Sequence, residues 1–148
     1  MKEERYFKND FMNMDSMHDS YANEAKIENG CLIIIYDKLD EGVLAPDGNP
    51  YYKNKKLTIK YNFETDCEAK FYYNKNKVIY VDLIDNIDLF IKITKNCLFR
   101  SYKYSLDCFG EIILDFSLRK LINGKYHNYK YWGLEIRLDA IDITYIWE

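Results

Sequence analysis

Short runs in which apolar and polar residues alternate dominate this chain, and such alternation is typical of half-buried strands. The clearest reversal is Asn29-Gly30, the strongest short hairpin signal, which joins residues 22–28 to residues 31–37. This turn sets Ile27 opposite Leu32 on one face of the hairpin. Only five alanines occur in 148 residues, so the pattern predicts a fold dominated by strands.

Two further hairpins are predicted in the middle of the chain. A three-residue turn at 64–66 sets the alternating run 57–63 against 67–73. A tight turn at 75–76 then pairs Tyr73 with Val78 and extends the sheet as a meander.

The apolar residues of 84–95 fit both the spacing of a strand and the spacing of a helix. Ile87, Leu89, Ile91 and Ile93 alternate as in a strand, whereas Ile84, Ile87 and Ile91 share a helical face. An acidic start and the lysines near the end suit a helix dipole, so we expect one helix here.

The C-terminal third predicts strands over 97–106 and 111–119 around a turn that contains Gly110, and a reversal at Asn123-Gly124. The apolar phase then slips near Gly133, and a β-bulge there would explain the slip. A last turn at residues 139–140 is expected to pair 132–138 with 141–147 and to bury their apolar residues on one face. The residues on that face are Trp132, Leu134, Ile136, Leu138, Ile141, Ile143, Tyr145 and Trp147, with Arg137 facing Asp142 on the other side.

These segments predict a mainly β (α+β) fold: about nine antiparallel strands in a curled or two-layer meander with one helix near 84–95. The length suits a single domain over residues 1–148. Residues 1–17 form a mobile N-terminal arm in this interpretation.

Charge and cysteine content narrow the function. The net charge is −3 with basic residues scattered along the chain, which disfavours nucleic-acid binding and permits a basic protein partner. Four cysteines without a C-x-x-C pair, and two histidines, predict free thiols and neither a metal site nor a cofactor. Because no hydrophobic signal core or membrane-spanning run is visible, we expect a cytoplasmic protein without membrane attachment.

The polar cluster His18-Asp19-Ser20 contains the residue types of a nucleophilic triad. In an extended chain Asp19 points away from His18 and Ser20, which argues against catalysis. We therefore expect the three residues to tie the N-terminal segment to the sheet through hydrogen bonds.

The segment Met17–Tyr21, followed by a strand, the Asn-Gly turn and the strand CLIIIYD, resembles the opening of uncharacterised small bacterial β-rich proteins with an N-terminal His-Asp-Ser motif. Those proteins also end in an aromatic strand like ITYIWE, and they resemble immunity proteins of polymorphic toxin systems. The resemblance implies a non-catalytic cytosolic binding protein that occludes a toxin. It transfers no catalytic role to any residue.

The long loop at 38–53 is the expected contact with a basic toxin domain or another protein. Its carboxylates would steer the partner and its tyrosines would anchor it; these residues are Asp40, Glu41, Asp47, Tyr51 and Tyr52. The alternatives are a small-molecule or carbohydrate-binding β domain and an unrecognised hydrolase. No catalytic motif supports an enzyme, and the oligomeric state is left open.

Overall fold

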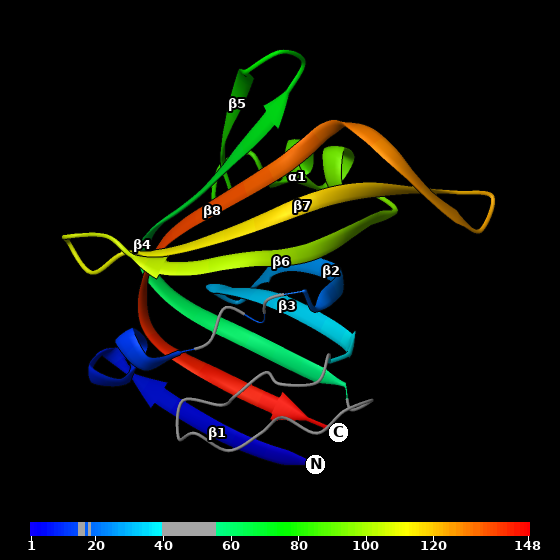
Figure 1. The fold of residues 1–148 in the computed structure, drawn as a ribbon. Coiled ribbons are helices and arrows are strands. Elements are labelled where there is room, and N and C mark those ends of the chain that lie inside the picture. The colour runs from blue at the N-terminus through cyan, green and yellow to red at the C-terminus, as the bar shows by residue number, and fades with distance from the viewer. Residues whose placement is uncertain (15–16, 18, 40–55) are drawn as a thin grey trace.

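The computed structural model describes residues 1–14, 17, 19–39 and 56–148. Eight strands, all paired antiparallel, form one sheet in the described part of the chain, which confirms the mainly β prediction, and a single α-helix accompanies them (Figure 1). The elements are β1 (Lys2–Phe7), the 3₁₀ turn η1 (Lys8–Asn13), β2 (Tyr21–Glu28), β3 (Cys31–Lys38), β4 (Leu57–Tyr73), β5 (Lys77–Asp82), α1 (Ile87–Thr94), β6 (Cys97–Leu106), β7 (Ile112–Ile122) and β8 (Lys125–Trp147).

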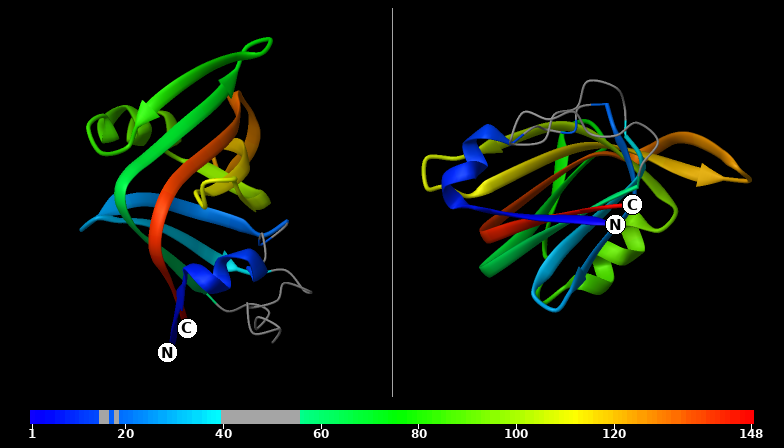
Figure 2. Two further views of the ribbon diagram at one scale, coloured as in Figure 1. Left: turned by 90° about the vertical axis from the view of Figure 1, so that its left-hand side faces the viewer. Right: turned by 90° about the horizontal axis from the view of Figure 1, so that it is seen from below.

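Two long strands organise the fold. The sheet order is β1-β8-β7-β6-β2-β3-β4-β5, and β4 also pairs with β8, so the sheet closes on itself. The second half of β8 pairs with β1 and the first half of β4, whereas its earlier part pairs with β7 and the second half of β4. The long strands therefore run from one layer of sheet into the other, as Figure 2 shows.

The two layers enclose the core. Inward-facing side chains alternate along β4, from Leu57 and Ile59 to Ala69 and Phe71, all of them fully buried. Helix α1 adds Phe90, whose ring lies 5.8 Å from that of Phe71. The helix begins at Ile87, so Ile84 lies before it, and of the expected face only Ile87 packs against the core while Ile84 and Ile91 are exposed.

Three of the predicted hairpin details hold. Ile27 lies opposite Leu32 across the Asn29-Gly30 turn, and reversals occur at Gly110 and at Asn123-Gly124. The turn between β4 and β5 lies at 74–76, so Tyr73 pairs with Lys77 rather than with Val78.

Two predicted hairpins are wrong, because β4 and β8 each run unbroken through the expected turns at 64–66 and 139–140. The apolar phase of β8 does change there, but an irregularity in the pairing with β4 absorbs the change: Asn62 pairs with Asp142 and Phe63 with Ala140. Arg137 accordingly contacts Asp107 at 3.1 Å, and Asp142 pairs with Arg5 at 2.6 Å.

The N-terminal segment predicted as an arm contributes β1 along the second half of β8, and it buries Phe11, Met14 and Met17 in the core. Lys2 pairs with Trp147, so the two ends of the chain lie side by side (Figure 1). Among the helices of the described ranges, none has the length and apolar character needed to span a membrane.

Candidate functional site

The β7–β8 hairpin projects from the body of the molecule, as Figures 1 and 2 show. A groove of about 560 Å³ lies at its base, on the outer face of the sheet. It is lined from four neighbouring strands by Tyr72, Tyr102, Lys103, Asp115, Phe116, Ser117, Trp132, Gly133 and Leu134. We call it the outer groove.

A β-bulge shapes one wall of the outer groove. Tyr72 pairs with Gly133 and Tyr73 with Tyr131, so Trp132 is the extra residue on β8. The bulge predicted near Gly133 is thereby confirmed, but its effect on Trp132 was missed. Instead of joining the buried face with Leu134, the Trp132 side chain is 52% exposed.

Aromatic rings form the wall that this bulge creates. The rings of Tyr72 and Trp132 lie 5.3 Å apart with planes inclined by 34°. Lys70 places its ammonium over the Tyr72 ring, 4.9 Å from the ring centroid, which helps to hold that ring in place. Tyr102, 65% exposed, stands on β6 where the pairing with β7 shifts by one residue.

Small residues keep the floor of the groove low. Gly133 and Ser117 are directly paired across β7 and β8. A Cβ on Gly133 would lie 3.3 Å from Cδ2 of Tyr72, a tighter approach than ordinary packing. Glycine therefore permits the Tyr72 ring to lie over the strand beside Trp132.

A row of four charged residues, two adjacent carboxylates flanked by two ammonium groups, borders the floor. In register across β4, β8, β7 and β6 stand Lys70, Glu135, Asp115 and Lys103. Partial burial is the main reason that the pKa of Asp115 is raised; the Glu135 carboxylate raises it further, while Lys103 and Arg137 lower it. The groove thus offers one desolvated carboxylate, one ammonium and one hydroxyl beside its aromatic walls.

The His-Asp-Ser cluster lies elsewhere. Asp19 accepts a hydrogen bond at 3.0 Å from Nε of Arg100, and its backbone N–H donates to Ser101 at 3.0 Å. Ser20 is buried and accepts from the Ser101 N–H. These contacts join the segment before β2 to β6, as a structural role requires; His18 lies outside the described residues.

The contact residues predicted on the 38–53 loop, namely Asp40, Glu41, Asp47, Tyr51 and Tyr52, also lie outside the described residues. All four cysteines are free, as predicted, and burial raises the pKa of Cys67 to about 12. Within the described ranges, no group of three or more His, Cys, Asp or Glu side chains is placed to hold a metal ion.

The sequence did carry a signal for the outer groove. Residues 116–134 hold Trp132, three tyrosines and four basic residues but no acidic one. That stretch was assigned to strands without a functional role, because the alternation placed Trp132 in the core.

No family model matches this chain, and no match was found among the curated proteins or the solved structures.

Proposed function

We propose that this protein is a non-catalytic binding protein and that the outer groove binds a ring-shaped ligand. The stack of half-exposed Trp132 on partly buried Tyr72, over a glycine floor, carries the proposal. Half-exposed aromatic rings expose apolar surface to water, and covering them with a flat ring recovers that surface. The arrangement is typical of small-molecule sites, which combine apolar walls with a few orienting polar groups.

The polar groups suit binding better than catalysis. Asp115 and Lys103 face each other across β6 and β7, where each compensates the charge of the other. Ser117 has no described histidine beside it to act as a base, since His127 pairs with Lys120 farther along the hairpin. The carboxylate and hydroxyl are therefore assigned the role of accepting and donating hydrogen bonds at the ligand's edge.

Toxin occlusion through the loop at 38–53 is a separate prediction and does not depend on the outer groove. A partner that covers the loop would bind equally well after changes at Trp132.

Calorimetric titration tests the groove, with maltohexaose and adenosine as neutral ring probes. We expect at least one probe to bind, and Trp132→Ala to weaken its binding by about tenfold or more, the usual effect of losing one stacking platform. Phe109→Ala is the matched control, because Phe109 is 87% exposed on the β6–β7 turn away from the groove. Equal binding by wild type and Trp132→Ala would refute the proposal.

A further inference from the structure

The two hairpins that contribute Tyr72 and Trp132 to the outer groove are rich in basic residues, although the whole chain has a net charge of −3. The β7–β8 hairpin has no acidic residue between Asp115 and Glu135, and the β4–β5 hairpin has none between Glu68 and Asp82. The basic residues of these two hairpins are Lys70, Lys75, Lys77, Arg119, Lys120, Lys125 and Lys130. Each of the two hairpins therefore carries a local excess of positive charge that an anionic partner could use.

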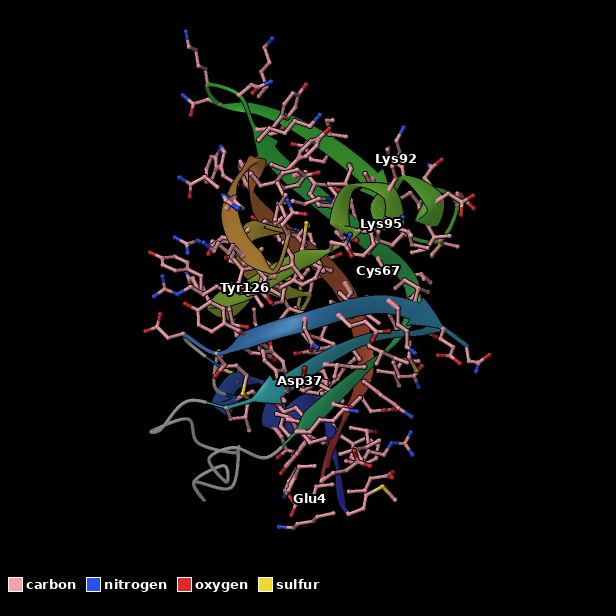
Figure 3. All side chains as sticks on the ribbon, turned by 90° about the vertical axis from the view of Figure 1, so that its right-hand side faces the viewer. Glu4, Asp37, Cys67, Lys92, Lys95 and Tyr126 are labelled. Atoms are coloured by element: carbon pink, nitrogen blue, oxygen red, sulfur yellow. The ribbon has the colours of Figure 1, made fainter. Side chains whose placement is uncertain are left out.

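Strand register divides these charges between two faces. Arg119 lies two residues after Ser117 on β7, so its side chain is on the same face as Ser117 and the groove. Arg119 pairs with Asn128 of β8, and Lys130, two residues after Asn128, is on this face as well. Lys120 lies on the other face, where its ammonium contacts the backbone oxygen of Lys95 and the ring of Tyr129. Figure 3 looks toward the projecting hairpin, with Tyr126 of β8 labelled at the left of the view and Lys92 of α1 at the right.

The groove-side cations are available to a ligand. Arg119 forms no ion pair with a carboxylate of the described residues, and Lys130 contacts the Tyr131 ring at 5.3 Å. An aromatic platform followed by cations along one face is the arrangement that binds bases by stacking and phosphates by charge.

We propose that the ligand of the outer groove is single-stranded nucleic acid. One base stacks against Trp132, and the following phosphates lie along Arg119 and Lys130 on the groove side of the β7–β8 hairpin. This inference rests on the proposed function, since it names the class of ring that the groove takes.

The remaining groove residues are compatible with such a ligand. A carboxylate at Asp115 accepts hydrogen bonds from the amino groups of bases, and Lys103 opposite it offsets its charge toward phosphate. From Ser117 to the hairpin tip the strand extends roughly 20 Å at about 3.3 Å per residue, enough for a strand of a few nucleotides. A free nucleotide would leave most of this face uncovered.

The test is fluorescence titration with a ten-nucleotide single-stranded DNA at several salt concentrations. Each phosphate contact on a single strand contributes about −0.7 to the slope of log K against log salt, which corresponds to about fivefold in affinity at 0.1 M salt. We expect Arg119→Gln and Lys130→Gln each to weaken binding about fivefold and to flatten the slope by about 0.7. Lys125→Gln removes the same charge from the same hairpin but on the opposite face, and we expect it to change affinity less than about twofold.

Trp132→Ala should weaken oligonucleotide binding by about tenfold, with a salt slope equal to that of wild type. Equal effects of Lys125→Gln and Lys130→Gln would overturn the inference, as would equally tight binding of a mononucleotide or of duplex DNA. If neutral ring probes bind at Trp132 and the oligonucleotide does not, this inference fails while the proposed function stands.

Discussion

The two tryptophans provide a direct test of how β8 is built. A hairpin at residues 139–140 would pair Trp132 with Trp147 on one buried face. The structure separates them: Trp147 is 8% exposed, whereas Trp132 is 52% exposed on the outer face. Replacing each by alanine should therefore have different effects on the free energy of unfolding.

The expected difference follows from the contacts of each ring. Trp147 packs 6.4 Å from the ring of Tyr145 and under the ammonium of Lys2, so Trp147→Ala should cost about 3–5 kcal/mol through lost burial and the cavity left behind. Trp132→Ala loses the stack on Tyr72 and little buried area, for about 1 kcal/mol.

Urea denaturation followed by circular dichroism measures both effects. We expect the midpoint to fall much farther for Trp147→Ala, with m-values close to that of wild type in both variants. Similar losses of about 3 kcal/mol or more at both positions would refute the bulge and support the hairpin.

Three further predictions concern buried and partly buried groups. Arg5→Met should destabilise the fold more than Lys8→Met, because Arg5 pairs with the buried carboxylate of Asp142 at 2.6 Å whereas Lys8 and Asp139 meet at the surface; urea midpoints of the two variants decide this. The raised pKa of Asp115 means that protonation favours the folded state, so stability from this group is present at low pH and lost as pH rises through the folded-state pKa. Asp115→Asn should accordingly gain stability relative to wild type as pH rises above the ordinary pKa of an aspartate, and a difference independent of pH would contradict the desolvation argument. In thiol labelling at neutral pH, exposed Cys108 should react first and buried Cys67 only on unfolding; fast reaction of Cys67 would contradict its position in the core.

A true chain reversal differs in backbone conformation from a place where the alternation of apolar residues only changes face. This difference separates the predicted hairpins that were correct from the two that were wrong. The true reversals contain residues with positive φ, among them Gly30, Asn76, Gly110 and Gly124. No described residue of 64–66 or 139–140 has positive φ. Asparagine and glycine adopt that conformation readily, so their absence at those two places was a usable signal.

The alternation of apolar and polar residues does not by itself distinguish a hairpin from one continuous strand. Along β4 the apolar residues keep the same odd-numbered phase on both sides of the exposed residues 64–66, which one long strand with an irregularity explains as well as a hairpin with a three-residue turn. Along β8 a phase change occurs near Gly133 and again near Asp142, and in both places it marks an irregularity within one strand. Which partners the long strands meet depends on sheet closure, a long-range property that local periodicity does not encode.

The shape of the outer groove could not be predicted from the sequence, because it also depends on which strands pair and in which register. Its wall exists because one inserted residue turns Trp132 outward, and its floor exists because Gly133 meets Ser117 and Tyr72 across two strands. The acid-free composition of residues 116–134 was visible in the sequence, but its division into two faces required the register of β7 and β8.

The central claim is that the outer groove binds its ligand against Trp132, and the indole N–H signals of the two tryptophans test it most directly. In ¹H–¹⁵N spectra recorded during titration with the ten-nucleotide single-stranded DNA, the Trp132 signal, assigned by its loss in Trp132→Phe, should shift progressively. The signal of buried Trp147 should stay in place. A titration in which the oligonucleotide binds but the Trp132 signal does not move, or in which Trp147 alone moves, would contradict the account.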